Sequence, residues 1–185
     1  MESNCQVQSV GVGKLLISGL LFEVIWLLCV LAPGPALLAG ITLGNLALHL
    51  WLFSGNPLDL EKVKRTLSWV ALVTVFGCWM DAALFRIGVF HANHDVFLLP
   101  SWLMFLWVNF ALALRFAFRF LHRNLILAAA VGALAGPFSY WIGARINGSV
   151  VLAEPVTHTG LLLAGLWGLF LPLLLVCARM RFFRP

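Results

Sequence analysis

TGLLLAGLWGLFLPLLLVCA, residues 159–178, contains no charged side chain. An α-helix needs about 20 mostly apolar residues to cross about 30 Å of hydrocarbon. A helix also pairs its backbone groups internally, which is required in lipid because lipid offers no hydrogen-bond partners. This stretch therefore predicts a membrane-spanning helix.

The rest of the chain extends the same pattern. Hydrophobic residues make up 62% of the 185 residues and charged residues 10%, whereas soluble domains carry about 25% charged residues. The sequence therefore predicts an all-α membrane protein, a single six-transmembrane-helix bundle over residues 1–185. The expected spans are residues 14–31, 36–53, 67–87, 101–120, 125–142 and 159–178.

Positive charge sets the orientation of this bundle. Of the 12 Lys and Arg residues, only Arg86 and Arg145 fall on the side opposite the termini. The positive-inside rule places the richer side in the cytoplasm, so both termini are expected to be cytoplasmic. The basic residues on the cytoplasmic side account for the net charge of +5. They favour contact with anionic membrane lipid. The charge pattern gives no support to a nucleic-acid partner.

The first span is expected to be retained rather than cleaved as a leader. Glu23 interrupts its apolar run, and the Pro33-Gly34-Pro35 turn does not resemble a cleavage site. The four cysteines contain no C-x-x-C pair, so the sequence indicates neither a disulfide framework nor a zinc site.

Two layers of polar residues are expected within the spans. An Asp or Arg at mid-helix costs roughly 2.5 to 3.5 kcal/mol, and depth follows from about 1.5 Å per residue. The layer from the bilayer centre toward the cytoplasm comprises Glu23, Thr42, Asn45, His49, Asn109 and Arg115. The layer toward the outer face comprises Asp81, Arg86, Ser139, Tyr140 and Arg145.

Each layer leaves two interpretations open. One is a satisfied polar network that fixes helix packing, and the other is a binding site. An Asp81–Arg145 ion pair would lower the cost of burying both groups. Arg115 is expected to reach toward Glu23 or His49, or to extend to the cytoplasmic interface.

Small residues recur at four-residue spacing, which lets helix backbones approach closely. The sets are Gly40 and Gly44; Gly132 and Gly136; and Gly160, Ala164 and Gly168. They are expected to be packing faces within the chain, with homodimerisation as the alternative. Gly136-Pro137 predicts a kink, whose freed carbonyls the hydroxyls of Ser139 and Tyr140 would pair. The tryptophans are expected mainly as interfacial anchors, Trp51 and Trp69 at the inner face, Trp102 and Trp141 at the outer.

The string His91-Ala92-Asn93-His94-Asp95 contains side chains that bind divalent metals. Glu154 and His158 fall in the next outer loop. A solvated loop explains the string equally simply, since its spacing does not bring the rings to one side. The chain contains no H-E-x-x-H, Walker or G-x-S-x-G motif, and the sequence leaves any cofactor unidentified.

Six stretches carry a family resemblance: residues 22–26 (FEVIW) with Cys29, 79–81 (WMD), 99–103 (LPSWL) with 106–107 (LW), 131–145 (VGALAGPFSYWIGAR), 166–167 (LW) and 171–174 (LPLL). They resemble the small bacterial inner-membrane proteins grouped as domain of unknown function 2878. The resemblance implies a multi-pass inner-membrane protein without an established activity, found alongside enzymes that modify membrane fatty acids. It assigns no catalytic residue, but it draws attention to Asp81 and the Gly136-Pro137 region.

The leading hypothesis is a polar pocket in the outer half of the membrane that binds a lipid-like or amphipathic small molecule. Its expected lining is Asp81, Ser139, Tyr140 and Arg145. Its expected role is either accessory to membrane fatty-acid modification or the carrying of a lipid-like metabolite. One alternative is a small proton-coupled transporter using Glu23, Asn45, His49 and Arg115, with Asn109 in the same layer. The others are a metal-dependent enzyme built on the His91–Asp95 string and a non-catalytic subunit bound to a protein partner or a second copy.

Overall fold

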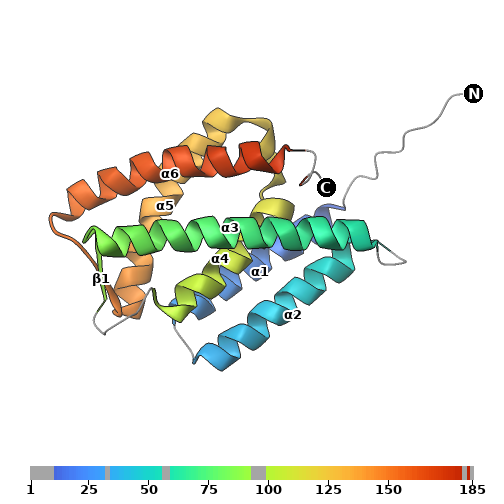
Figure 1. Cartoon of the computed structure of the whole chain (residues 1–185), viewed down its shortest axis with the longest axis horizontal. Helices are drawn as coiled ribbons and strands as arrows, with labels where there is room; N and C mark the ends of the chain where they lie inside the picture. The colour runs from blue at the N-terminus through green and yellow to red at the C-terminus, as the bar shows by residue number, and fades with distance from the viewer. Residues whose placement is uncertain (1–10, 32–33, 56–58, 93–98, 181–182, 184–185) are drawn as a thin grey trace, which may run out of the picture.

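The computed structural model describes residues 11–31, 34–55, 59–92, 99–180 and 183. Its elements are α1 (Val12–Val30), α2 (Pro35–Phe53), α3 (Leu60–Arg86), β1 (Phe90–Ala92), α4 (Ser101–Phe116), the 3-10 helix η1 (Arg119–Arg123), α5 (Leu125–Asn147), β2 (Val150–Leu152) and α6 (Val156–Ala178). The α-helices alternate in direction, so α1 begins at the end of the bundle where α6 finishes (Figure 1). The two strands lie at the opposite end, which we call the ribbon end.

Five of the described helices, all but α4, are long and apolar enough to cross a membrane. The sixth, α4, is apolar but has only 16 residues, which corresponds to about 24 Å. The chain is therefore a multi-pass membrane protein.

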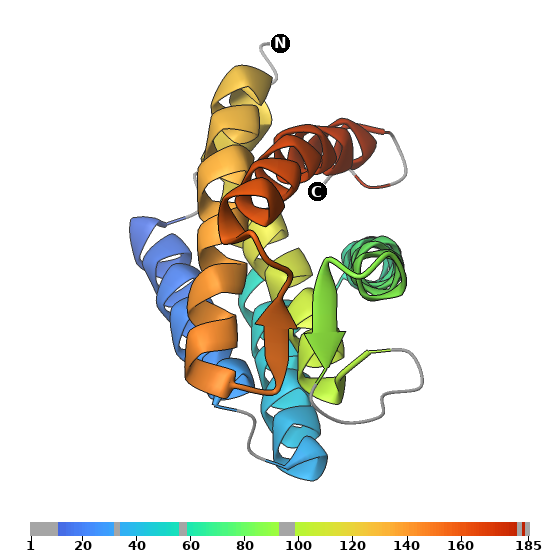
Figure 2. The ribbon, with the colours of Figure 1, turned by 90° about the vertical axis from the view of Figure 1, so that its left-hand side faces the viewer.

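The short helix α4 lies at the centre of the bundle, against α1, α2 and α3. Residues 111–116 of α4 are all buried, and the Trp69 indole of α3 donates a 2.9 Å hydrogen bond to the Ala111 carbonyl. Helices α5 and α6 pack closely on each other, and α5 passes between α1 and the strand pair when the ribbon end faces the viewer (Figure 2). A short helix suits this central place because α4 is covered by protein rather than by lipid.

The helix boundaries differ from the expected spans where polar residues begin or end a helix. Helix α3 starts at Leu60 rather than at residue 67, because the Asp59 side chain caps it by accepting from the N–H groups of Glu61 and Lys62. At 27 residues, or about 40 Å, α3 extends beyond the hydrocarbon thickness. Helix α5 runs on to Asn147 and ends at Gly148, whose φ of 65° closes the helix.

The end of α4 also departs from the expectation. The helix stops at Phe116, four residues before the expected end at 120. The Phe118 N–H donates to the Ala113 carbonyl five residues back, which widens the turn and leads into η1. The chain therefore reverses into α5 through a short 3-10 segment.

A two-stranded antiparallel ribbon was not expected in an all-helical chain. Strand β1 pairs with β2 in the register Phe90–Leu152, His91–Val151 and Ala92–Val150. Gly88, with φ of 77°, provides the turn after α3. Because the two strands follow α3 and α5, the ribbon ties together the ends of two helices that are far apart in sequence.

The small-residue sets differ in what they pack against. A Cβ atom at Gly132 would lie 2.4 Å from the Trp167 carbonyl oxygen, so α5 and α6 approach closely there, as expected. Gly40 and Gly44 have nothing within 4 Å of their Cβ positions among the described residues, and Gly160 is equally open. The expectation of an internal packing face is therefore wrong for α2.

Candidate functional site

Asp81 is the most completely buried acidic side chain in the described part of the chain, with 0% exposure. Its Oδ2 accepts a 2.7 Å hydrogen bond from the Trp107 indole of α4, and its Oδ1 accepts from the Tyr140 hydroxyl of α5. Both oxygens therefore act as acceptors. One carboxyl group thus joins α3, α4 and α5 inside the bundle.

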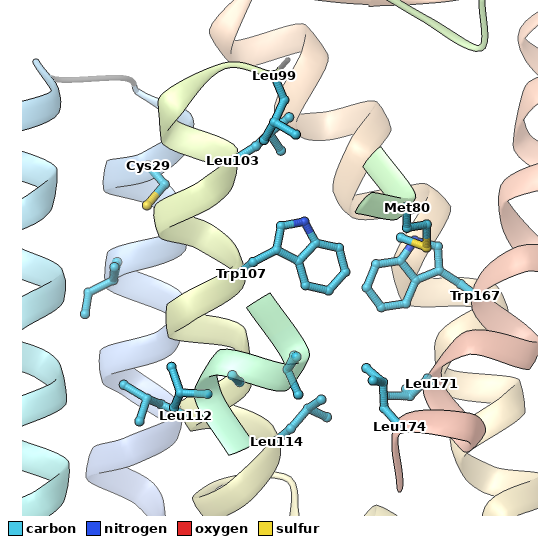
Figure 3. Close-up of a cluster of buried hydrophobic side chains, with 14 of the residues drawn as sticks. Cys29, Met80, Leu99, Leu103, Trp107, Leu112, Leu114, Trp167, Leu171 and Leu174 are labelled. Carbon is cyan, nitrogen blue, oxygen red and sulfur yellow. The ribbon is translucent and has the colours of Figure 1, made fainter. Parts of the chain in front are cut away.

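Trp107 continues from this carboxyl into a pair of stacked indoles. The rings of Trp107 and Trp167 lie 5.6 Å apart with an angle of 4° between their planes, and Figure 3 shows them facing each other from α4 and α6. Each ring occupies space that a glycine leaves open. A Cβ atom at Gly77 would lie 2.0 Å from the Trp107 ring, and one at Gly136 would lie 2.3 Å from the Trp167 ring.

A cavity of about 390 Å³ lies beside this cluster. Most of its wall is aromatic or aliphatic and comes from α1, α4 and α5, with smaller contributions from α3, α6, η1 and both strands. Its polar lining side chains include Glu23, Asp81, Ser139 and Tyr140. Such a wall, apolar with a few converging polar groups, is typical of small-molecule sites of 300 to 1,000 Å³.

The cavity opens to the side of the bundle rather than at the ribbon end. Most of its exposed lining residues lie on α5, and the others are Glu23 on α1 and Phe120 on η1. Glu23 faces the opening together with Ala135 and Ser139. At the ribbon end the buried side chains of Phe90 and Val150 close it. The opening between α1 and α5 therefore faces the surroundings of the helices, which for a membrane protein are the bilayer.

Of the expected outer-layer residues, Asp81, Ser139 and Tyr140 line this one cavity and Arg145 does not. The expected Asp81–Arg145 ion pair is wrong, since Asp81 bonds to Trp107 and Tyr140. Arg145 is exposed, with its guanidinium 5.5 Å from the centre of the Trp141 ring. Depth along the helices placed Asp81 and Arg145 in one layer. However, Arg145 lies on a face of α5 that points away from Asp81, toward the surroundings.

Helix α5 continues through Pro137, and the Tyr140 hydroxyl does not pair with a carbonyl freed by the proline, as was expected. It donates to Asp81 on a different helix. Ser139, the other expected partner, is exposed at the cavity opening.

Four of the expected inner-layer residues form a separate polar network with Ser18 between α1, α2 and α4: Thr42, Asn45, His49 and Asn109. The Asn45 amide donates to Asn109 Oδ1 at 2.8 Å, and the Asn109 amide donates to Thr42 Oγ1 at 3.0 Å. His49 Nδ1 lies 2.9 Å from the Asn45 carbonyl, and His49 Nε2 lies 2.8 Å from the Ser18 hydroxyl. Because a carbonyl only accepts, Nδ1 carries a proton, and the neutral ring accepts from Ser18 through Nε2.

The four residues expected to serve a transporter do not share one place. Asn45 and His49 belong to the network above, whereas Glu23 lines the cavity. Arg115, 7% exposed, donates from Nε to Thr66 Oγ1 and from Nη1 to the Phe183 carbonyl, both at 3.0 Å. It therefore reaches neither Glu23 nor His49, and it holds the chain near its C-terminus against α3 and α4.

The expected metal string falls only partly within the described residues. His91 lies in β1, exposed and paired in register with Val151, while His94 and Asp95 lie outside the described residues. Within the described ranges, no three His, Cys, Asp or Glu side chains gather closely enough to hold a metal ion.

Sequence reasoning missed the tryptophans at this site. Trp107 and Trp167 were treated as part of an interfacial set, yet they are 4% and 8% exposed. Trp69 and Trp102, expected at the two interfaces, are 0% and 7% exposed. A usable signal was present: Gly77 precedes Asp81 by one helical turn, and Gly136 precedes Tyr140 by one turn. Residues four apart lie on one face of a helix, so each glycine leaves space beside the polar residue one turn on.

The chain belongs to a family of proteins of unknown function, DUF2878, whose sequence profile matches residues 15–173. This match contains every residue of the cavity lining named above. No curated protein and no solved structure matches the chain.

Proposed function

We propose that this member of the DUF2878 family binds an amphipathic, lipid-like small molecule in the cavity between α1, α4 and α5. The observation that carries the proposal is the cavity itself, about 390 Å³ with a mostly apolar wall. The carboxyl of Asp81 and the hydroxyls of Ser139 and Tyr140 give it one polar region. An occupant with an apolar body and a single polar end matches both parts of this wall.

The location of the opening supports the bilayer as the source of the occupant. Glu23 and Ser139 flank it on α1 and α5, two helices long and apolar enough to span a membrane. A molecule dissolved in the membrane would reach the cavity by moving sideways between these helices. In contrast, the ribbon of β1 and β2 closes the cavity at the end where α3 and α5 finish.

The proposed setting is a bacterial inner membrane, with α4 as a sixth crossing and both termini in the cytoplasm. Among the Lys and Arg residues that the structure describes, only Arg86 and Arg145 lie toward the ribbon end, which agrees with the positive-inside rule. A reporter active only in the cytoplasm, fused after Pro185, is expected to be active. Activity from a reporter inserted after Gly148 instead would reverse this orientation.

An accessory role in membrane fatty-acid modification would follow from binding of this kind, with the protein presenting or carrying the bound amphiphile. The transporter alternative has less support, because Asn45, His49 and Arg115 are engaged in contacts away from the cavity. A protein partner or second copy would have the open face of α2 around Gly40 and Gly44 available.

Occluding the opening tests the binding proposal. Ala135 lines the cavity at its opening and is exposed, so Ala135→Trp places a large ring there without displacing buried side chains. Leu134→Trp is the matched control, because Leu134 is the next residue, 76% exposed, and does not line this cavity. The measurement is mass spectrometry of the small molecules that each purified variant retains.

A defined amphiphile retained by the wild type and by Leu134→Trp, but lost from Ala135→Trp, is the expected result. If all three proteins are folded and retain the same mixture of bulk lipid, the cavity does not bind a ligand and the proposal fails.

A further inference from the structure

Basic side chains from three elements converge at the end of the bundle opposite the ribbon. The segment η1, which carries Arg119 and His122, packs against α4, α5 and α6. Arg179, at the end of α6, donates from Nη2 to the His122 carbonyl at 2.6 Å, and His122 Nε2 lies 3.1 Å from the Leu114 carbonyl of α4. Arg115, Arg119 and Arg179 all lie close enough to His122 to act on its charge. We call Arg115, Arg119, His122 and Arg179 the basic cluster.

Arg115 is the buried member of the basic cluster, with 7% exposure. Its guanidinium donates to two neutral oxygens, Thr66 Oγ1 and the Phe183 carbonyl. The charged side chains that act on it are Arg65 and Arg119, both positive. Among the described residues, Arg115 forms no ion pair with an Asp or Glu. Because a buried charge is normally paired with an opposite one, an anion bound beside Arg115 would be favourable.

The basic cluster can be reached from outside the bundle. Arg119 and Arg179 are exposed and His122 is half-buried, so an anion would meet guanidinium groups without any helix moving apart. A guanidinium pairs through two parallel hydrogen bonds with phosphate. The cluster also lies where helices end, on the side proposed as cytoplasmic, and basic pockets between helices on that side suit anionic head groups.

We propose that the basic cluster is an anion site that binds one phosphate group at the cytoplasmic surface of the membrane. The site is separate from the cavity, since none of its four residues lines the cavity. The phosphate belongs either to the head group of an anionic membrane lipid or to a soluble phosphate compound, and the recognition chemistry is the same. A general attraction of basic residues for anionic lipid would not distinguish one exposed arginine from another, whereas this site does.

Two probes separate the two sources of phosphate. The purified full-length protein in nanodiscs of phosphatidylcholine is titrated with inorganic phosphate, and in a second set of nanodiscs one fifth of the lipid is phosphatidylglycerol. Native mass spectrometry measures what stays bound. One retained phosphatidylglycerol identifies a lipid head group as the source, and saturable binding of inorganic phosphate without anionic lipid identifies a soluble compound.

Two arginines of η1 provide matched variants. Arg119 is exposed, so Arg119→Gln removes one charge of the basic cluster without disturbing buried packing, and it is expected to weaken binding by at least about tenfold. Arg123→Gln is the control, because Arg123 is also exposed on η1 but is not among the charges that act on His122. It is expected to weaken binding by no more than about fivefold, the general contribution of one basic residue near an anionic surface.

The pKa of His122 reports where the anion binds. Burial and the three neighbouring arginines hold this pKa below its usual 6.5, and a phosphate placed among these arginines would raise it by favouring the charged ring. The measurement is an NMR titration of the His122 ring with and without the probe that binds. In Arg119→Gln, adding the same probe should leave the pKa of His122 unchanged.

Binding of either probe that depends more on Arg119 than on Arg123, with a raised pKa of His122, is the expected result. The inference is overturned if neither probe binds, if the two variants bind equally well, or if the probe does not move the pKa of His122. None of these results bears on the cavity, which Ala135→Trp tests separately.

Discussion

At the centre of this protein, each of two tryptophan rings fills the space left by one glycine. Gly77 leaves space for Trp107, and Gly136 leaves space for Trp167. The two rings then stack on each other and connect the α3–α4 pair with the α5–α6 pair. In lipid, where apolar burial gives little driving force between helices, such close packing is a main source of stability.

Gly136→Ala is expected to destabilise the protein by about 1 to 3 kcal/mol, because the new methyl would lie 2.3 Å from the Trp167 ring. The measurement is the melting temperature in detergent. Gly40→Ala is the control, since its Cβ position has nothing within 4 Å among the described residues, and alanine favours a helix over glycine by about 0.5 to 1 kcal/mol. Equal melting temperatures for the two variants would contradict the packing account.

Asp81→Asn is expected to destabilise the protein by about 1 to 3 kcal/mol, because an amide nitrogen would face either the Trp107 or the Tyr140 donor. Tyr140→Phe removes one of these donors. The double variant should therefore lose less stability than the sum of the two single variants. Strict additivity in chemical unfolding would show that the carboxyl and the hydroxyl are not coupled.

Helices α1, α2 and α4 are held together by polar contacts rather than by glycine and tryptophan. Asn109 alone makes three hydrogen bonds, to Asn45, Thr42 and the Phe105 carbonyl. None of these residues lines the cavity. This network is therefore best understood as a device that fixes how the elements pack.

Asn109→Ala is expected to lower the free energy of unfolding by about 1 to 3 kcal/mol while leaving ligand retention unchanged. The two readouts are chemical unfolding and mass spectrometry of retained molecules. Loss of retention in a folded Asn109→Ala protein would instead connect this network with the binding site.

The 3-10 segment η1, outside the helices that span the membrane, carries a pH-sensitive group. Burial, with Arg119, Arg179 and Arg115 nearby, lowers the pKa of His122 below its usual 6.5, and the hydrogen bond to the Leu114 carbonyl offsets part of this effect. Between the lowered value and 6.5 the unfolded chain binds more protons than the folded one. Stability is therefore expected to fall as the pH drops below about 6.5.

His122→Gln retains a donor for the Leu114 carbonyl and removes the titration. The melting temperature of this variant should depend less on pH between 5 and 7 than that of the wild type. The same pH dependence in both proteins would show that other groups cause it.

Sequence patterns predicted most of the elements but not their detailed ends. Runs of apolar residues located all six helices, because lipid requires long apolar segments. The additional turns of α3 at Leu60 and of α5 up to Asn147 depend on Asp59 and Gly148 at their ends, outside the apolar runs. The ribbon of β1 and β2 could not be predicted, because it depends on where α3 and α5 end in space.

At the scale of the whole molecule, the site combines residues from all the described elements except α2, and a single sequence does not reveal how these elements are arranged. Depth along the helices correctly grouped Asp81 with Ser139 and Tyr140. Depth gave no information on which side of a helix a residue faces, so Arg145 was wrongly included and Glu23 was assigned to a different layer.

Site-specific photocrosslinking can capture the amphiphile that we propose enters the cavity between α1, α4 and α5 from the bilayer. A benzophenone amino acid replaces Phe22, which lines the cavity, and in a second protein Leu43, which is 65% exposed on α2 and does not line it. Crosslinks from position 22 should capture one defined amphiphile, while those from position 43 capture the bulk lipid mixture. The same bulk mixture at both positions would show that the cavity holds no particular amphiphile.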